Sequence, residues 1–199
     1  MTREQQMAML AKCVYRGAFP PVYNVIYRGE VGNTQFAILT LGREVIAVFA
    51  GSNQLKDWCM NALVRRRNNV HRGFLTDYEQ TAPKLYAILN DMHRDCLVCV
   101  GHSYGGGIAN IMALDMAKGQ CYDHQEIYTF GCPRVGNKQF SRELNGYVSL
   151  HRRYANRYDI VARVPFGFGY KHAGHPVKFS TGRHGMDDYL ANMGVVRPK

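Results

Sequence analysis

Gly101-His102-Ser103-Tyr104-Gly105 is the segment of this sequence that decides the fold. It follows the apolar, β-branched run Leu97–Val100 and precedes the small, helix-permissive residues Gly106–Ile111. Between a strand and a helix, a G-x-S-x-G segment holds its serine in a tight, strained turn with the hydroxyl exposed. Backbone N–H groups and the helix dipole stabilise negative charge at that place, which suits an attacking oxygen. A glycine-rich turn with an incidental serine is the alternative, and the flanking strand and helix make it the weaker interpretation.

Predicted strands and helices alternate through the middle of the chain. Period-two and helical spacings of apolar residues separate the two kinds of element. Strands are expected at residues 35–40, 44–50, 97–100, 126–131 and 151–156, and helices from the N-terminus to about Tyr15, at 73–92, from the serine turn to about Lys118, and at 184–192. This alternation predicts an α/β fold with a mostly parallel central sheet flanked by helices. No repeat or linker divides the sequence, so we expect a single domain over residues 1–199.

The composition excludes several classes of protein. The 199 residues are 46% hydrophobic, and no apolar run approaches the roughly 18 residues of a membrane span. The N-terminus lacks the apolar stretch of a secretory signal. Among six cysteines, Cys96 and Cys99 form a C-x-x-C pair that a strand would place on opposite faces, and no second pair completes a zinc site. We therefore expect reduced thiols and a cytoplasmic or other intracellular location, with a mature secreted form as the alternative.

The net charge of +10 is high for this length, and Arg65-Arg66-Arg67 is the sharpest cluster of positive charge. Such a run is usually a solvated face. It also predicts attraction to an anionic membrane surface, by peripheral contact rather than insertion. The sequence contains no zinc-finger spacing and no aromatic-rich strand near the basic run, so we expect no nucleic-acid partner. No feature indicates an obligate protein partner.

Five blocks between residues 45 and 165 carry a more specific signal. They are Val48–Ser52 followed by Asp57-Trp58, Val70–Phe74, Val100–Gly106, Tyr128–Asn137 and Asn156–Val161. In this order they resemble the blocks of the class 3 lipases, the fungal lipase-like group of α/β-hydrolases, including V-H-x-G-F, Y-T-F-G-x-P-R-V-G-N and N-x-x-D-x-V. The resemblance implies the α/β-hydrolase fold and ester hydrolysis by a serine. The first 30 residues resemble no family that we can name.

A serine hydroxyl is a poor nucleophile at neutral pH, so Ser103 requires a base and a carboxylate that orients the base. In α/β-hydrolases the chain order is serine, acid, histidine. Asp159 is the best candidate acid because it follows an apparent strand, and the resemblance places the family's acid there. The alternative is that Asp159 caps a turn. Asp187 and Asp188 follow the last histidine and are expected on a helix surface.

Three histidines follow the candidate acid, namely His172, His175 and His184. His184 precedes the last predicted helix, where the resemblance places the catalytic histidine, so we expect it to be the base. Many members of the family have an aspartate directly before that histidine, whereas this sequence has Arg183. His172 lies in a Y-x-H-x-G segment whose histidine is usually structural in the family, and it remains the main alternative. His102 is too close to Ser103 along the chain to act as its base.

The oxyanion of an acyl-transfer intermediate needs two hydrogen-bond donors. One is expected to be the backbone N–H of Tyr104, the residue after the nucleophile. By resemblance, the other is the backbone N–H of Ser52, with its hydroxyl as a further donor. The alternative is that Gly51-Ser52 caps the helix that follows, and both interpretations are compatible.

The resemblance also implies a short helical lid directly after Ser52. In the segment Asn53–Val64, the apolar residues recur at helical spacing and include Leu55, Trp58 and Leu63. A lid or interfacial docking surface would place Arg65–Arg67 at its edge, facing lipid phosphates. The alternative is a helix that packs permanently on the core.

The sequence therefore predicts a serine carboxylic-ester hydrolase that acts on lipid esters, similar to a triacylglycerol lipase, through Ser103, Asp159 and His184. No metal and no cofactor is expected. A phospholipase A1 or galactolipase, and a water-soluble esterase, are alternatives with the same triad. A non-catalytic lipase-like interaction protein is an alternative of a different class.

Overall fold

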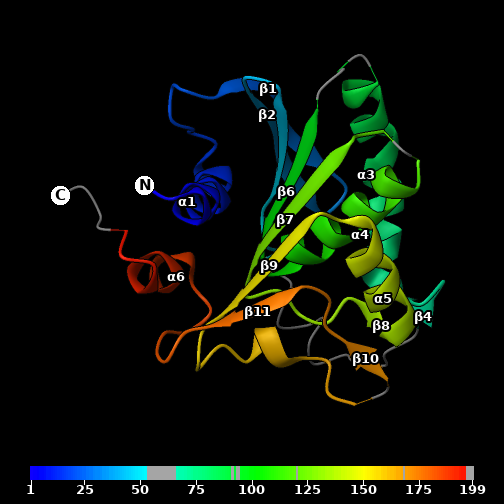
Figure 1. Cartoon of the computed structure of the whole chain (residues 1–199), viewed down its shortest axis with the longest axis vertical. Helices are drawn as coiled ribbons and strands as arrows, with labels where there is room; N and C mark the ends of the chain where they lie inside the picture. Colours follow the sequence, from blue (N-terminus) through cyan, green and yellow to red (C-terminus); the bar gives the residue numbers. More distant parts are fainter. Residues whose placement is uncertain (53–65, 91, 93–94, 120, 168, 196–199) are drawn as a thin grey trace.

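The computed structural model describes all residues of the chain except 53–65, 91, 93–94, 120, 168 and 196–199. Its centre is a seven-stranded sheet in the order β1-β2-β3-β6-β7-β9-β11 (Figure 1). The strands are β1 (Asn24–Val31), β2 (Thr34–Leu41), β3 (Glu44–Phe49), β6 (Cys96–His102), β7 (His124–Phe130), β9 (Leu150–Ala155) and β11 (His175–Lys178). Strands β3 to β11 pair in parallel, whereas β1 and β2 form an antiparallel edge. The predicted α/β fold with a mostly parallel sheet is confirmed.

Helices cover both faces of the sheet (Figure 1). One face carries α3 (Arg72–Leu89), α4 (Tyr104–Lys118) and α5 (Lys138–Tyr147), and the other carries α1 (Arg3–Arg16) and α6 (Met186–Asn192). A 3-10 helix, η1 (Val161–Arg163), follows β9. A second, small sheet in the order β10-β8-β5-β4 contains β10 (Tyr170–Lys171), β8 (Gly136–Asn137), β5 (Val70–His71) and β4 (Arg66–Arg67). Among the described residues, none of the helices has the length and apolar character to cross a membrane.

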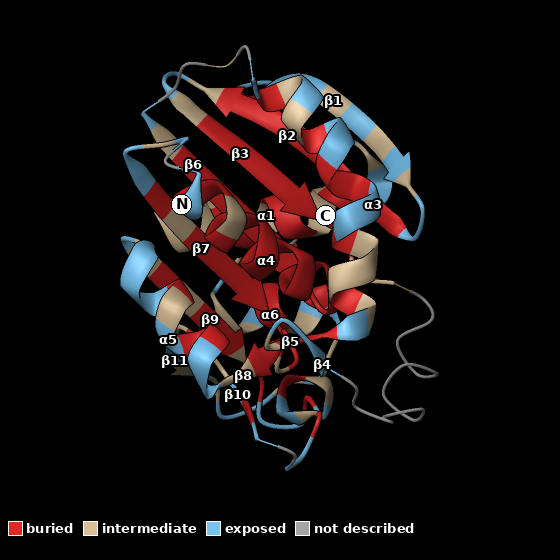
Figure 2. Ribbon diagram, turned by 90° about the vertical axis from the view of Figure 1, so that its right-hand side faces the viewer, coloured by how far each residue is buried: buried red, intermediate tan, exposed pale blue. Residues whose placement is uncertain are grey.

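Each face of the sheet has its own hydrophobic core because side chains alternate along a strand. On β6, Leu97 and Cys99 pack into the core under α3 and α4, whereas Val98 and Val100 pack into the core under α1 and α6. Cys96 contacts this second core, so the two cysteines of the C-x-x-C pair lie on opposite faces as predicted. Figure 2 shows β3, β6 and β7 as mostly buried strands that are less buried toward their amino ends. Both cores therefore depend on the central parallel strands.

Most of the predicted elements lie within a few residues of the observed ones. The last helix begins at Met186 rather than at residue 184, because Gly185 is its extended N-cap (φ −67°, ψ 144°). His184 consequently lies in a loop. Strands β1 and β11 and helix α5 were not predicted. Strand β1 is exposed or only partly buried throughout its length, and β11 is short and mostly exposed, so neither has the apolar pattern of a core strand.

Two glycines of the serine turn are required by close packing of backbone on backbone. A Cβ added to Gly101 would lie 2.4 Å from the carbonyl oxygen of Gly105, and one added to Gly105 would lie 2.4 Å from the carbonyl oxygens of Phe49 and Ala50. Real Cβ atoms essentially never approach backbone so closely. The start of α4 can therefore lie against the end of β3 only without a side chain at position 105.

We expect Gly105→Ala to lower the free energy of unfolding by about 1–3 kcal/mol or more, because the clash is with backbone that cannot move aside. Gly146→Ala in α5 is the matched control, since no atom lies within 4 Å of the added Cβ. The control should be neutral or raise stability by up to about 1 kcal/mol through helix propensity. Urea denaturation of both variants measures the difference, and equal stabilities would contradict the packing argument.

Candidate active site

Ser103 lies at the carboxyl end of β6, directly before α4, in a conformation that few non-glycine residues adopt (φ 58°, ψ −124°). Its N–H donates to the carbonyl oxygen of Phe130 at the end of the neighbouring strand β7 (2.8 Å). Gly51, after β3, is so close that an added Cβ would lie 2.9 Å from the Ser103 Cβ. The strand, turn and helix context predicted from the G-x-S-x-G segment is therefore present, with the positive φ of a strained turn.

The structure brings Ser103, His184 and Asp159 together. The Ser103 Oγ lies 2.8 Å from His184 Nε2, and His184 Nδ1 lies 2.9 Å from both carboxylate oxygens of Asp159. In this arrangement the serine hydroxyl donates to Nε2, and the N–H at Nδ1 donates to the carboxylate. A Cβ on Gly131 (φ 62°) would lie 2.6 Å from Asp159 Oδ2 and 2.9 Å from His184 Nδ1, so only glycine leaves room for this contact.

Asp159 is fully buried and receives hydrogen bonds from three residues. Besides His184, the Tyr189 hydroxyl donates to Oδ2 (2.5 Å) and the backbone N–H of Ala162 donates to Oδ1 (3.2 Å). Burial alone would raise the pKa of Asp159, but the hydrogen bonds from His184, Tyr189 and Ala162 outweigh it and hold the pKa below its ordinary value. The carboxylate is therefore ionised at neutral pH and can orient the imidazole.

Sequence reasoning missed Tyr15 of α1, whose hydroxyl connects two parts of the site. The Gly51 N–H donates to the Tyr15 hydroxyl oxygen (2.7 Å), and that hydroxyl lies 2.6 Å from His102 Nδ1. On the other side of the ring, His102 Nε2 lies 2.8 Å from the carbonyl oxygen of His184. Since a carbonyl only accepts, Nε2 carries the proton and Nδ1 accepts from Tyr15. Burial, followed by the nearby His184, lowers the pKa of His102 to about 4, which keeps this ring neutral.

The alternative bases do not contact the serine. The Nε2 of His172 lies 3.0 Å from the carbonyl oxygen of Ala162, and burial lowers its pKa to about 3. His175 is exposed on β11. The backbone of Arg183, where the sequence departs from the family pattern, contacts two residues: its carbonyl accepts from Asn156 Nδ2 (2.7 Å), and its N–H donates to Asp188 (2.6 Å). The loop before His184 is thus held by backbone contacts that do not need an aspartate at position 183.

The two residues predicted as oxyanion donors belong to different segments of the chain. Tyr104 is the first residue of α4, directly after Ser103, and its hydroxyl donates to Asp77 (2.5 Å). Ser52 follows Gly51, which packs against Ser103. The predicted lid residues Leu55, Trp58 and Leu63, together with Arg65, lie outside the described residues. Of the basic run, Arg67 forms an ion pair with Glu79 and Arg66 lies over the ring of Tyr170.

One group of described side chains could hold a metal ion. The ligand atoms of Cys96, His124 and Glu126 lie within 4.8 Å of one another, at the amino ends of β6 and β7. Glu126 already forms an ion pair with Arg3 (2.9 Å). This group lies at the amino ends of the strands, whereas Ser103 follows the carboxyl end of β6, so the group does not belong to the serine site. The five cysteines that the structure describes are all free thiols.

Comparisons with known proteins identify the family of this chain. Residues 46–168 match the family described as Lipase (class 3). A lipase of Rhizomucor miehei is 30% identical over 147 residues, which cover 66% of this chain and 40% of that protein. Secreted mono- and diacylglycerol lipase 1 of Fusarium solani is 29% identical over 143 residues, covering 65% and 42% respectively. The chain thus spans about two fifths of the length of these curated relatives.

Solved lipase structures have the same fold. The lipase of Rhizopus microsporus var. chinensis superposes with a TM-score of 0.77 at 23% identity, covering 88% of this chain and 72% of that one. The triacylglyceride lipase of Rhizomucor miehei gives a TM-score of 0.75 at 24% identity, covering 87% and 77%. Because the family match extends over more than half of the sequence, this chain belongs to the class 3 lipase family.

Proposed function

We propose that this chain is a serine carboxylic-ester hydrolase that cleaves lipid esters in the manner of a triacylglycerol lipase. The observation that carries the proposal is the continuous hydrogen-bond chain from Ser103 through His184 to Asp159, with links of 2.8 and 2.9 Å. These three groups supply the nucleophile, the general base and the orienting acid of acyl transfer. Membership of the class 3 lipase family supports a lipid ester as the substrate.

In the proposed reaction, the Ser103 oxygen attacks the ester carbonyl carbon while His184 Nε2 takes the hydroxyl proton. The tetrahedral intermediate collapses, the bond to the alcohol oxygen breaks, and His184 returns the proton to the departing alcohol. Water then attacks the acyl-enzyme with His184 again as the base, which releases the fatty acid and restores the serine. Asp159 remains ionised throughout, because its hydrogen bonds hold its pKa low.

The backbone N–H groups of Tyr104 and Ser52 are proposed as the donors to the oxyanion. Tyr104 begins α4, where the first N–H groups of a helix have no intrahelical acceptor and the helix dipole favours negative charge. The contact between Gly51 and Ser103 supports Ser52 as the second donor, because it brings the end of β3 against the nucleophile. A donor of this kind contributes about 3–4 kcal/mol to transition-state stabilisation in other serine hydrolases.

We propose an acylglycerol as the lipid substrate. The relatives are named as triacylglycerol and as mono- and diacylglycerol lipases, which supports an acylglycerol. Hydrolysis of matched acylglycerols, phospholipids and galactolipids distinguishes an acylglycerol lipase from a phospholipase A1 or galactolipase, and a chain-length series distinguishes it from a water-soluble esterase.

The net charge of +10 supports peripheral attraction to an anionic membrane surface. Labelling of Ser103 by an organophosphonate would exclude a non-catalytic interaction protein.

Ser103→Ala should lower the hydrolysis of p-nitrophenyl esters by about 10³-fold or more, because the acyl-enzyme can no longer form. Circular dichroism and the urea midpoint of the variant should match the wild type, since only one oxygen atom is removed. Activity within about tenfold of the wild type would exclude Ser103 as the nucleophile.

Ser103→Ala combined with His184→Ala should be little worse than Ser103→Ala alone, because residues that act as one unit lose their contribution together. His172→Ala is the matched control, since that ring contacts the Ala162 carbonyl and not the serine. We expect the control to keep most of the activity. Multiplicative losses in the double variant, or an inactive His172→Ala enzyme with active His184→Ala, would reject His184 as the base.

Tyr15→Phe should lower kcat by about tenfold with little change in KM. The Gly51 N–H and the buried His102 ring would each lose a partner, and a buried group left unsatisfied costs about 1–3 kcal/mol. Tyr23→Phe, a buried tyrosine close by in the sequence, is the control and should keep its kcat. If both variants lose activity equally, or if only KM changes, Tyr15 has no special part in positioning the site.

A further inference from the structure

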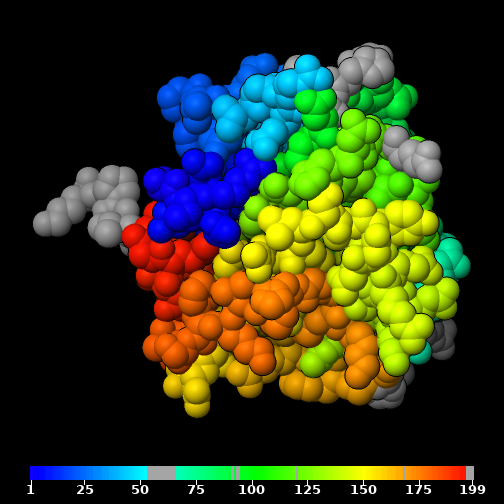
Figure 3. Space-filling view, viewed as in Figure 1, coloured from blue at the N-terminus to red at the C-terminus, as the bar shows by residue number. Residues whose placement is uncertain are grey.

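A cavity of about 860 Å³ lies beside the loop that carries the catalytic acid. It is bounded by the end of β9, by residues 156–163 and by the end of β11. In Figure 3 these segments, yellow to orange, adjoin on the lower part of the molecule. Asn156 and Ala162 line the cavity, whereas Ser103, His184 and Asp159 do not. The cavity is therefore separate from the serine site, on the other side of the same loop.

The described lining of this cavity is strongly basic. Five of its side chains are cationic and none is acidic: Arg134, Arg153, Arg157, Arg163 and Lys178. Among the described residues, none of these five side chains forms an ion pair. Five cationic residues line this one cavity. Like charges near one another repel, and a bound anion would relieve that repulsion.

Two of the five cationic side chains donate to backbone carbonyls. Arg134 donates to the carbonyl oxygens of Arg163 and of Pro165, the latter at 2.9 Å, and Arg163 donates to the carbonyl of Arg157. The guanidinium of Arg157 also lies 5.9 Å from the centre of the Tyr158 ring. Such contacts orient the side chains but leave their charges without a negative partner in the described part of the chain.

Arg153 is the deepest of the group. It is 9% exposed, its Nε has no hydrogen-bond partner in the structure, and no described residue pairs with its charge. Burial lowers the pKa of Arg153, and the neighbouring Arg134 lowers it further. A buried guanidinium that lacks a counter-charge is destabilising, and an isolated protein rarely retains one without a use. The histidine in this lining supplies no negative charge, and because burial lowers the pKa of His172 to about 3 it adds no positive charge at neutral pH.

The chemistry of the lining selects the kind of anion. The planar fork of a guanidinium matches the oxygen atoms of carboxylates and phosphates. A phosphomonoester carries about −1.5 to −2 charges near neutral pH, against one for a carboxylate, and so suits several cations better. The volume exceeds that of a phosphate alone and lies within the range of small-molecule sites. Tyr158 and Phe179 add aromatic surface for an organic group.

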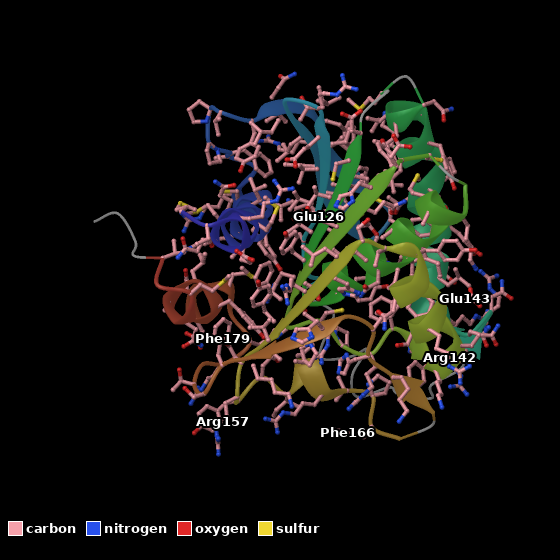
Figure 4. All side chains as sticks on the ribbon, viewed as in Figure 1. Glu126, Arg142, Glu143, Arg157, Phe166 and Phe179 are labelled. Carbon is pink, nitrogen blue, oxygen red and sulfur yellow. The ribbon has the colours of Figure 1, made fainter. Side chains whose placement is uncertain are left out.

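We propose that this cavity binds the phosphate group of a phosphomonoester, with Arg153 at its base and the exposed Arg157 and Lys178 at its rim. Figure 4 labels Arg157 and Phe179 at the same lower corner of the molecule, where the loop after β9 meets the end of β11. The phosphate belongs either to a small soluble molecule or to a lipid headgroup such as that of phosphatidic acid. This site is distinct from ester hydrolysis and does not depend on it.

Isothermal titration of the full chain with glycerol 3-phosphate and with inorganic phosphate tests the site. We expect saturable binding that weakens as salt increases, because the attraction is between charges. Arg153→Met should weaken binding at least tenfold. Arg152→Gln is the matched control, since the adjacent residue of β9 points to the opposite face of the sheet and does not line the cavity. It should bind as the wild type does.

If Arg153→Met does not fold, the double variant Arg157→Gln and Lys178→Gln tests the same site, because both side chains are exposed and can be replaced without disturbing the core.

Co-sedimentation with vesicles of phosphatidylcholine, with and without phosphatidic acid, distinguishes a lipid headgroup from a small soluble molecule as the source of the phosphate. Capture by phosphatidic acid that these variants lose identifies a headgroup, whereas binding of the soluble esters alone identifies a small molecule. The proposal is overturned if neither soluble phosphate binds and vesicle capture is unchanged in the cavity variants, or if the control loses binding equally.

Discussion

Close approach of three strand ends is the constraint on which the rest of this structure depends. The carboxyl ends of β3, β6 and β7 meet around Ser103, and the residues after β3 and β7 are Gly51 and Gly131 in the places where a side chain would collide with the triad. Ser103 itself has a positive φ, which costs about 1–3 kcal/mol and persists only where the surroundings enforce it. Here the enforcement comes from β6, which lies between the two cores, and from α4, which is almost completely buried on one face of the sheet. The stability of the sheet thus holds the nucleophile in its strained conformation.

The site is completed by segments outside the block that identifies the family. The family match ends at residue 168, yet His184 and Tyr189 follow it, and Tyr15 precedes its start. Helices α1 and α6 pack side by side on one face of the sheet, so residues from both ends of the described chain reach the serine turn. Tyr15 contacts Gly51 and His102, and His102 contacts the carbonyl oxygen of His184. These hydrogen bonds connect the segment after β3 to the loop that carries His184.

The sequence could predict the helices and strands whose apolar residues recur at regular spacing, and the turn that has a defined motif. The central strands and α1, α3 and α4 have apolar spacings long enough to be recognised, and the serine turn is identified by its glycines. The small sheet could not be predicted, because its two-residue strands have no period. Tyr15 and Tyr189 had no local signal either, since they meet His102 and Asp159 across 87 and 30 residues of chain. His184 was expected as the partner of Ser103 from the resemblance, despite Arg183, and the fold adds the 2.8 Å contact between them. The intracellular location and the lid after Ser52 stay predictions.

Two buried charges lie on either side of the loop between β9 and η1, the Asp159 carboxylate and the Arg153 guanidinium, and they differ in their partners. On one side, the Asp159 carboxylate is neutralised in effect by hydrogen bonds from Tyr189, Ala162 and His184, without any arginine. The arginines on the other side are therefore not needed to stabilise the catalytic acid. Arg153 is nonetheless buried, and its neighbours in the cavity share its sign. Because desolvating a charge is costly whatever its sign, the same physical rule that explains the donors around Asp159 requires an acceptor beside Arg153. The described part of the chain supplies hydrogen-bond donors to Asp159 but no acceptor for the charge of Arg153. A bound phosphate would supply that acceptor.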